Sequence, residues 1–329
     1  MRMPGKAAVL ATTLACVLFA LPSSRAICAD DYPSRPVTIV VPFTPGGTND
    51  ILARYEAEVL QRALHGSFVV ENRPGAGGAI GARSVAAAAP DGHTLLVGNT
   101  SVLAVIPAVS ASAGYDPMKS FAPVAQISAS YQILVVHPSA PWNSVAAFVA
   151  DAKVHPGKLN VAHAGAGGLP HLTAELFKAR AGVDLVGVPY KGGGESVAAL
   201  LGQQVDCTFE AISILLPLIR EGRLRALGIT SRARTPLAPD IPTLLEAGVP
   251  DYEVTTFYGV VAPAGTPQAI VTRLNAATNA GFATEEMRAA ITKLGSSLAL
   301  GTPDAFGAFM AAENAKWSEV ARRANIRID

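Results

Sequence analysis

The feature that most constrains the fold of this chain is a pattern that occurs twice: a β-branched strand runs into a glycine-rich turn that opens a helix. The first copy is PVTIVVPFTPGGT at 36–48, and the second is KLNVAHAGAGG at 158–168. About 120 residues separate them, close to the size of one domain. We therefore predict two similar lobes, each containing a strand, a Gly-Gly turn and a helix N-terminus.

Around these copies, β-branched apolar runs alternate with amphipathic stretches, and Gly and Pro residues separate them. One such stretch places Ile51, Leu52 and Tyr55 on a single helical face. This alternation predicts an α/β fold with mostly parallel sheets. The predicted strands are 37–41, 67–71, 94–98, 133–136, 159–162, 185–188, 207–210, 226–230 and 258–262. The predicted helices are 50–64, 145–153, 169–179, 196–201 and 269–280.

The first 30 residues have the features of a secretory signal peptide. Arg2 and Lys6 precede an apolar stretch at 7–21, and small residues flank Arg25. The apolar stretch of about 15 residues is shorter than the roughly 20 that span a bilayer. We predict a signal peptide over 1–26, with cleavage after Ala26 or Ala29, and export to the periplasm. Its removal leaves 23 basic and 25 acidic residues, so the exported chain is mildly acidic.

The three cysteines are Cys16, Cys28 and Cys207. Cys16 leaves with the signal peptide, and Cys28 stays or leaves according to the cleavage site. At most one disulfide, between Cys28 and Cys207, can therefore form. The fold does not depend on a disulfide framework.

A glycine-rich turn that opens a helix is suited to hold an anion, because its first N–H groups are unsatisfied and the helix dipole is positive there. In the second copy, Gly165, Gly167 and Gly168 allow a ligand to approach the backbone, and Pro170 suits the first helical position. His171 can offer its ring or its backbone N–H. The turn predicts a carboxylate site, and the alternative is a tight turn without a ligand.

The sequence lacks the motifs of nucleotide, metal and hydrolytic chemistry. It has no P-loop string, and the glycines at 75–81 place the last glycine of a dinucleotide fingerprint one residue late. The six histidines form no zinc motif, and no GxSxG elbow occurs. Lys and Arg are scattered, which argues against nucleic-acid binding. We predict no cofactor, no metal site and no catalytic residue.

Two charged residues end or follow predicted strands. Lys191 is a candidate ligand cation, and the alternative is a solvated lysine at a strand end. Glu210 ends the strand at 207–210, and open α/β sheets bind ligands at the carboxyl ends of parallel strands. We therefore expect Glu210 near the ligand.

Strings spread along nearly the whole chain after the signal peptide resemble the Bug-type periplasmic substrate-binding receptors of tripartite tricarboxylate transporters. They occur in one order at 32–47, 70–78, 90–96, 168–172, 188–192, 200–206, 239–243 and 259–267. The resemblance implies a two-lobed type II "Venus flytrap" with two interlobe crossings. It places lobe one at 30–128 plus 252–329 and lobe two at 129–251.

The resemblance further implies a monomeric receptor that is not an enzyme and that holds a small mono- or dicarboxylate between its lobes for delivery to membrane permease subunits. It implies ligand contacts in lobe one at Phe43, Thr44, Gly46, Gly47, Asn99, Thr100 and Ser101. In lobe two it implies Ala164, Gly165, Gly167, Gly168, His171 and Glu210. The turn at 164–168 has alanines where many relatives carry hydroxyls, and an acid at 210 favours a ligand bearing an amine.

Two alternatives remain open. An exported hydrolase would use Cys207 or His171 as a catalytic group, but it needs an activating base at suitable spacing, and the sequence offers none. A receptor for a sensor kinase of a two-component system would have the same cleft as a transport receptor, so the sequence does not separate sensing from transport.

Overall fold

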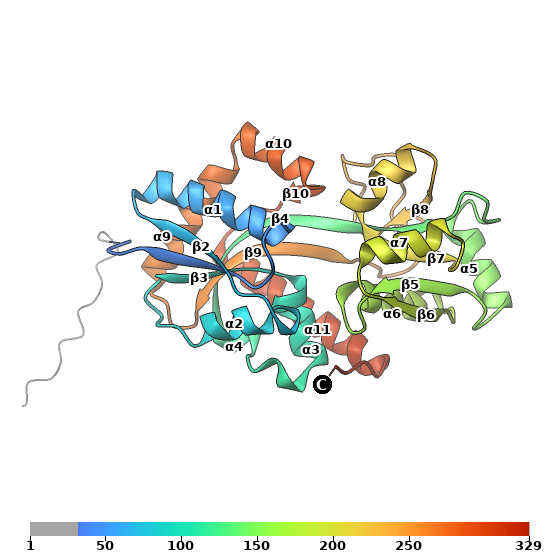
Figure 1. Ribbon diagram of the computed structural model, residues 1–329, viewed down its shortest axis with the longest axis horizontal. Coiled ribbons are helices and arrows are strands. Elements are labelled where there is room, and N and C mark those ends of the chain that lie inside the picture. The colour runs from blue at the N-terminus through green and yellow to red at the C-terminus, as the bar shows by residue number, and fades with distance from the viewer. Residues whose placement is uncertain (1–31, 329) are drawn as a thin grey trace, which may run out of the picture.

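The computed structural model describes residues 32–328. The predicted signal peptide, with Cys16 and Cys28, lies outside the described residues. One sheet of ten strands runs in the order β2-β1-β3-β9-β4-β7-β5-β6, and β10 and β8 each pair with β4 (Figure 1). The strands are β1 Val37–Val41, β2 Phe68–Asn72, β3 Thr94–Asn99, β4 Phe121–Val136, β5 Asn160–Ala164, β6 Val186–Tyr190, β7 Cys207–Ala211, β8 Arg225–Ile229, β9 Thr255–Pro263 and β10 Ser296–Leu298.

Strand β4 is 16 residues long and belongs to both halves of the molecule. Tyr131 pairs with Thr255 of β9, whereas the next residue, Gln132, pairs with Ala211 of β7. We call β1, β2, β3, β9, β10 and the first part of β4 lobe one, and β5 to β8 with the end of β4 lobe two (Figure 1). The chain crosses first along β4 and again where residue 254 leads into β9.

Thr230 joins the two crossing segments. Its Oγ1 accepts the backbone N–H of Gln132 at 3.0 Å and donates to the carbonyl oxygen of Val254 at 2.7 Å. The side chain is fully buried, so water does not compete for these bonds. Thr230 therefore fixes the spacing of the two strands where lobe two begins.

The sheet is mixed, and the expectation of mostly parallel sheets is wrong. Strand β1 is parallel to β2 and β3, and β5 is parallel to β6 and β7. Every antiparallel pair involves β4 or β9. These two strands carry the chain between the lobes in opposite directions, and the residue pattern within a strand does not encode its direction.

The predicted strands all occur, with ends that differ by at most three residues, except that the strand predicted at 133–136 begins at Phe121. The first part of β4 escaped prediction because Pro123 and the buried polar residues Ser128, Ser130 and Gln132 interrupt its apolar pattern. Their burial follows from the position of β4 in the middle of the sheet, where neighbouring strands cover both edges.

Eleven α-helices, with short 3-10 and π turns η2 to η4, connect the strands in the described part of the chain. None of these helices is long and apolar enough to cross a lipid bilayer. The helices are α1 Thr48–Leu64, α2 Ala79–Ala86, α3 Ile106–Val109, α4 Pro117–Ser120, α5 Val145–Val154, α6 Leu169–Ala181, α7 Gly193–Leu201, α8 Ile212–Arg220, α9 Gln268–Phe282, α10 Glu285–Lys293 and α11 Pro303–Arg323. The turns are η2 Ala76–Gly78, η3 Ser101–Val105 and η4 Ala111–Ala113.

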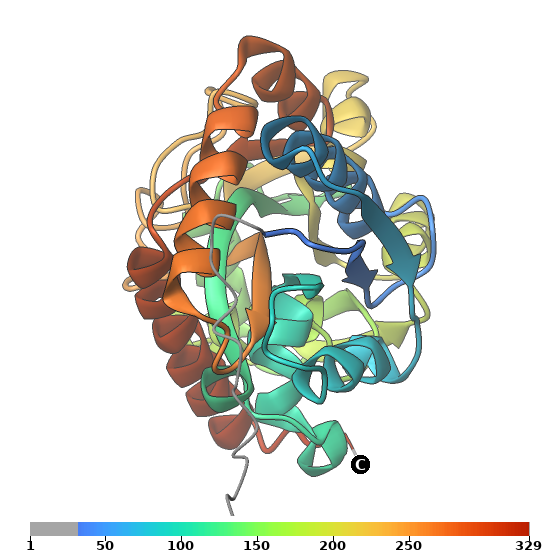
Figure 2. The ribbon, with the colours of Figure 1, turned by 90° about the vertical axis from the view of Figure 1, so that its left-hand side faces the viewer.

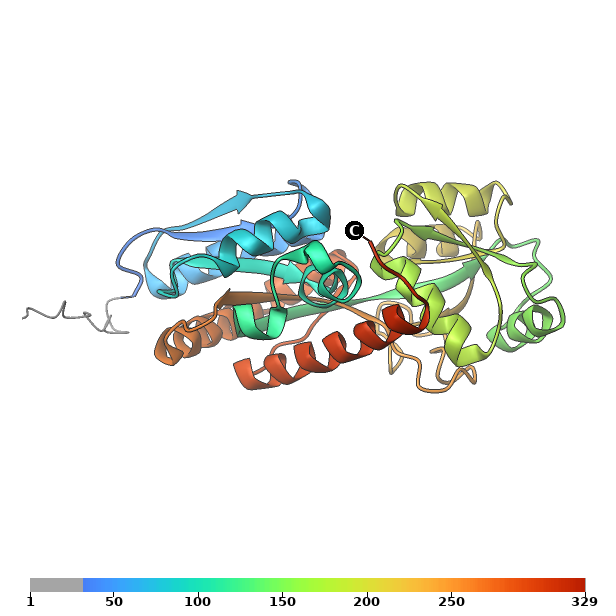
Figure 3. The same cartoon turned by 90° about the horizontal axis from the view of Figure 1, so that it is seen from below.

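Helix α11 lies beneath both lobes. Figure 2 shows α9 and α11 along one side of β4 and β9, and Figure 3 shows α11 reaching from lobe one to α6 of lobe two. Its Trp317 is fully buried in the same apolar cluster as Phe177 and Tyr252 of lobe two. The Nε1–H of Trp317 donates to the buried Glu313 at 2.9 Å. The C-terminal part of α11 therefore packs into the apolar core of lobe two.

Candidate functional site

The glycine-rich turn of lobe one connects β1 to α1 and is held by one buried acid. Asp50 accepts hydrogen bonds from the backbone N–H of Gly46, from Asn72 Nδ2 and from Arg54 Nε, each at 3.0 Å. Burial opposes ionisation of Asp50, but these donors outweigh it and hold the pKa of Asp50 below its usual range. Asn72 also donates to the carbonyl oxygen of Phe43 at 3.1 Å. The turn therefore has a fixed shape.

Within this turn, Thr44, Gly46 and Gly47 are exposed, and the ring of Phe43 is half-buried. A Cβ on Gly46 or Gly47 would have no atom within 4 Å, so open space lies beside both. Gly47 is the N-cap of α1, and no side chain caps the helix. The N-terminus of α1 thus presents backbone donors to the space in front of it.

The other predicted lobe-one contact residues, Asn99, Thr100 and Ser101, have different roles in the structure. Asn99 donates to Asn49 Oδ1 at 3.0 Å and accepts from Val102 N. Thr100 is fully buried, and its Oγ1 donates to the carbonyl oxygen of Thr255 and accepts from the N–H of Phe257. The Thr100 side chain therefore anchors β9 and has no surface for a ligand. Ser101 is half-buried at the start of η3.

All three glycines in the turn of lobe two donate their N–H groups within the protein, and Gly168 donates to the carbonyl oxygen of Gly165 at 3.4 Å. Gly165 donates to the carbonyl oxygen of Tyr190 at 2.8 Å, and Gly167 donates to His171 Nδ1 at 3.0 Å. The donors that we expected at these two glycines therefore point elsewhere. Gly168 is the N-cap of α6, without a side-chain cap, and Ala164 is half-buried beside it. The backbone N–H groups at the start of α6 are therefore the donors that this turn can still offer.

His171 stacks on His163, with ring centroids 4.2 Å apart and planes inclined by 12°. Burial, and then the neighbouring His171, lower the pKa of His163 to about 4. Burial also lowers the pKa of His171. Both rings are therefore neutral at pH 7, and Nδ1 of His171 is already an acceptor. The expectation that the His171 ring holds an anion has no support in this geometry.

A third glycine turn, which the sequence analysis did not include in the site, connects β6 to α7. Gly192 is the N-cap of α7, has no side-chain cap, and has no atom within 4 Å of where its Cβ would lie. The string VPYKGGG at 188–194 repeats the strand, turn and helix pattern and could have revealed it. Lys191 is exposed beside this turn.

The turns of the two lobes face one another. Figure 1 shows the first turns of α1 and α7 on the facing sides of lobes one and two. Contacts at this edge cross between the lobes, since a Cβ on Gly295 of lobe one would lie 2.7 Å from Ser213 Cβ in α8. Helices α5, α10 and α11, in contrast, begin at Ser or Thr residues whose side chains accept a backbone hydrogen bond. Helices α1, α6 and α7 share an uncapped glycine start with α2, and among these the starts of α1 and α7 face each other across the two lobes.

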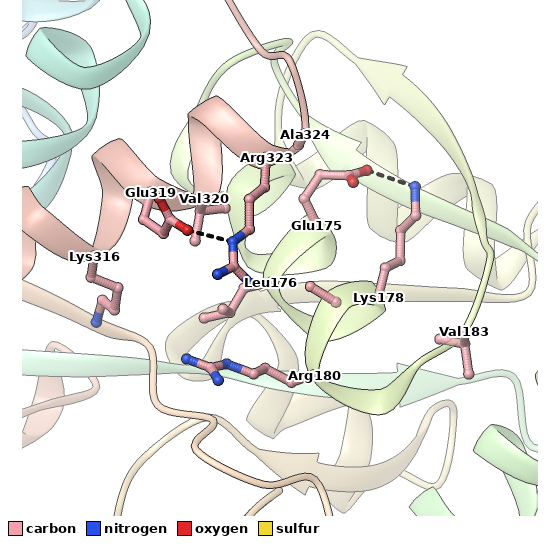
Figure 4. A pocket seen from close by; sticks show the side chains of 11 residues that line it. Glu175, Leu176, Lys178, Arg180, Val183, Lys316, Glu319, Val320, Arg323 and Ala324 are labelled. Carbon is pink, nitrogen blue, oxygen red and sulfur yellow. Dashed lines mark hydrogen bonds and ion pairs between the residues drawn. The ribbon is translucent and has the colours of Figure 1, made fainter.

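A cavity of about 470 Å³ lies elsewhere, between α6 and α11 (Figure 4). Its lining is apolar at Val320, and its charged groups all have partners. Glu175 pairs with Lys178 at 2.9 Å and Glu319 with Arg323, while Lys316 and Arg180 pair with Glu313 and Asp251 outside the lining. No charge there is left for a small acid.

The rival catalytic group, Cys207, is fully buried in β7. Burial, and then Asp206, raise the pKa of its thiol, which removes the thiolate that a nucleophile needs. Between residues 32 and 328, no group of three or more His, Cys, Asp and Glu residues is arranged to hold a metal ion.

Comparison with known proteins gives one consistent result. The family described as "Tripartite tricarboxylate transporter family receptor" matches residues 52–326. BugT of Bordetella pertussis is 36% identical over 329 residues, which cover all of both chains. A solved structure of an R. palustris protein with adipate is 37% identical, with a TM-score of 0.76 over 90% of this chain and 99% of that one. MatC from Rhodopseudomonas palustris with bound malate is 36% identical, with a TM-score of 0.72 over 88% and 99%.

The family match covers most of the described chain, and the likeness to BugT extends over its whole length. The structural likenesses confirm the predicted two-lobed binding-protein fold. This chain therefore belongs to the receptor family of the tripartite tricarboxylate transporters.

Proposed function

We propose that this protein is an extracytoplasmic receptor that binds a small carboxylic acid between its lobes and delivers it to a tripartite tricarboxylate-type membrane transporter. The observation that carries this proposal is the set of three uncapped helix N-termini, α1 from lobe one and α6 and α7 from lobe two. Each offers unsatisfied N–H groups and the positive end of a helix dipole, which attract carboxylates.

The ligand contacts of this proposal lie on both lobes. In lobe one they are Phe43, Thr44, Gly46, Gly47, Asn99 and Ser101, with Thr100 positioning the strand behind them. In lobe two they are Ala164, Gly168 and Glu210, with Gly165, Gly167 and His171 shaping the turn. The relatives with adipate and with malate support a carboxylate as ligand. A ligand that touches both lobes favours the closed arrangement over the open one.

The site of action in this proposal is the periplasm, after removal of the signal peptide, where the monomeric receptor meets the permease subunits. Family membership supports the transporter as partner.

A thermal-shift screen with C3 to C8 mono- and dicarboxylates, aromatic acids and acidic amino acids tests the binding function. A ligand at about 100 times its Kd adds about 2.7 kcal/mol to the free energy of unfolding. Small-angle scattering of the same samples should show a smaller radius of gyration with the ligand that shifts most. Absence of a shift with every acid would contradict the proposal.

A further inference from the structure

A second cavity between the lobes lies on the side of β4 away from the glycine turns. Strand β4 has β9 and β7 along one edge and β10 and β8 along the other. The turns before α1, α6 and α7 follow β1, β5 and β6, which lie beyond the first edge, whereas this cavity lies at the second. Figure 2 shows α1 to one side of β4 and the segment that follows β8 to the other.

We call this space the hinge cavity. Its volume is about 550 Å³, larger than that of the cavity between α6 and α11. It is lined by Tyr131, the segment 232–237, Glu253, Arg288, Thr292, Ser297 and Leu298.

Both lobes and both interlobe crossings contribute to the hinge cavity. Helix α10 and strand β10 of lobe one form one wall, and the segment after β8 of lobe two forms the other. Tyr131 is the last residue of β4 that pairs with β9, and Glu253 lies just before the second crossing. A molecule that fills the cavity therefore touches the two lobes and the two segments that join them.

The lining of the hinge cavity is positively charged. It contains three arginines, Arg288 from lobe one and Arg232 and Arg234 from lobe two, and one acid, Glu253, so that three positive charges and one negative charge give a net charge of +2. The exported chain as a whole has more acidic than basic residues. The charge of this cavity is thus opposite to that of the protein and attracts an anion with more than one negative charge.

Two of the three arginines keep hydrogen-bonding capacity for a ligand. Arg234 Nε donates to Glu246 Oε2 at 2.9 Å, which holds this side chain in place. Arg232 Nη1 lies 3.7 Å from Glu253 Oε2, longer than a hydrogen bond. The Arg288 guanidinium forms no ion pair with any residue between 32 and 328. One open arginine therefore lies on each wall of the cavity.

Tyr131 adds a neutral donor to these charges. Its hydroxyl group has no hydrogen-bond partner in the described part of the chain. Burial, and then Glu253, raise the pKa of Tyr131, so the phenol keeps its proton. Guanidinium and phenol groups donate hydrogen bonds, and the fork of an arginine matches two oxygens of one phosphate or carboxylate. This donor set fits a ligand with several acceptor oxygens.

We propose that the hinge cavity is a second ligand site, which binds a multivalent oxyanion of the phosphate or pyrophosphate type between Arg288 of lobe one and Arg232 and Arg234 of lobe two. The site is separate from the carboxylate cleft and does not rest on the proposed function. Because its arginines come from both lobes, the bound oxyanion links the lobes and favours the arrangement shown in Figure 1.

Titration calorimetry at constant ionic strength with inorganic phosphate and pyrophosphate tests the proposal. Pyrophosphate should bind one to one and at least fivefold more tightly than phosphate, because it offers more charge and more acceptor oxygens. Arg288→Gln and Arg232→Gln, one on each wall, should each weaken pyrophosphate binding at least fivefold. Arg220→Gln, at an exposed arginine of α8 outside the lining, is the matched control and should change the affinity less than twofold.

Two further variants give results that a general attraction of anions would not give. Glu253→Gln removes the acid of the lining and releases Arg232, so pyrophosphate should bind at least twofold more tightly. Gly47→Val, in the α1 turn of the cleft, should leave pyrophosphate affinity unchanged.

Each contrary outcome has its own meaning. Absence of pyrophosphate binding, or equal weakening by Arg220→Gln and Arg288→Gln, would show that the hinge cavity is no specific site. If Gly47→Val weakens pyrophosphate binding and Arg288→Gln does not, the anion occupies the cleft and the proposal is wrong. If every carboxylic acid fails to bind while pyrophosphate binds as described, the receptor function fails and the hinge site stands.

Discussion

Ile328 packs so closely on Gly167 that a Cβ at position 167 would lie 2.7 Å from Ile328 Cγ2. The backbone N–H of Ile328 also donates to the carbonyl oxygen of Val109 at 2.8 Å. One residue near the chain end therefore contacts the glycine turn of lobe two and the segment after η3 of lobe one (Figure 3). The end of the chain joins the lobes beside the cleft.

Truncation after Asn325 should destabilise the protein. It removes the hydrogen bond to Val109 and the half-buried side chains of Ile326 and Ile328, which together are worth on the order of 2 kcal/mol. Urea unfolding of the truncated and full chains measures the difference. Ile214→Ala, at an exposed apolar residue, should change the free energy of unfolding by less than about 0.5 kcal/mol. Equal stability of the truncated and full chains would contradict the bridging role.

His171→Ala should affect the turn more than the ligand. It removes the Nδ1 acceptor of the Gly167 N–H and the ring that stacks on His163, which should cost about 1 to 2 kcal/mol of stability. Carboxylate affinity, measured by calorimetry on the folded variant, should fall less than about tenfold, or about 1.4 kcal/mol. A complete loss of binding with unchanged stability would show that the ring itself holds the anion.

Gly47→Val should weaken carboxylate binding while leaving the fold intact. Gly47 has φ −80° and ψ 169°, which valine adopts easily, and no protein atom lies within 4 Å of its Cβ position. The new side chain therefore occupies space only where a ligand reaches the N-terminus of α1. We expect the affinity to fall at least about tenfold, or about 1.4 kcal/mol. Thermal unfolding without ligand is the control. Gly168→Val is less informative, because its Cβ would lie 3.0 Å from the carbonyl oxygen of Ala164.

The stability of the protein should depend on the protonation of His163. Burial first, and His171 second, lower the pKa of His163 to about 4, below the ordinary value of 6.5. Between pH 6.5 and about 4 the unfolded chain binds a proton that the folded chain does not, so the free energy of unfolding falls as the pH falls through this window. His163→Phe removes this titration. From pH 7 to pH 5 it should lose less stability than the unmodified protein, by on the order of 1 to 2 kcal/mol. The exposed His155→Gln serves as the control, and identical slopes in all three proteins would contradict the prediction.

Glu56 gives the opposite pH dependence. It is fully buried, its Oε1 accepts from Thr278 at 2.6 Å, and its Oε2 has no partner. Burial raises the pKa of Glu56 to about 8 from 4.5. The folded chain therefore binds a proton that the unfolded chain lacks, and the stability that this gives is present below pH 4.5 and is lost as the pH rises to about 8. Glu56→Gln should remove this loss, so that its stability relative to the unmodified protein rises between pH 5 and pH 8. A constant difference between the two proteins would contradict it.

The sequence alone predicted nine of the ten strands and five of the eleven helices in the described part of the chain, because apolar periodicity indicates which face of each segment is buried. It also indicated the turns at Gly46 and Gly168 and the family, through strings that run along the whole chain. It placed Glu210 correctly near the end of a parallel strand. These features are local, and a short stretch of residues is enough to specify them.

Only the tertiary structure decided which of the candidate donors remain open to a ligand. Thr100 is used by Thr255, 155 residues away, and Gly167 is used by His171 and covered by Ile328. The directions of β4 and β9, and the burial of Glu210 with an unpartnered Oε1, likewise depend on segments far apart in the sequence. Whether a hydrogen-bonding group is free to bind a ligand depends on the atoms that folding brings next to it. The periodicity of residues within one segment does not specify those atoms.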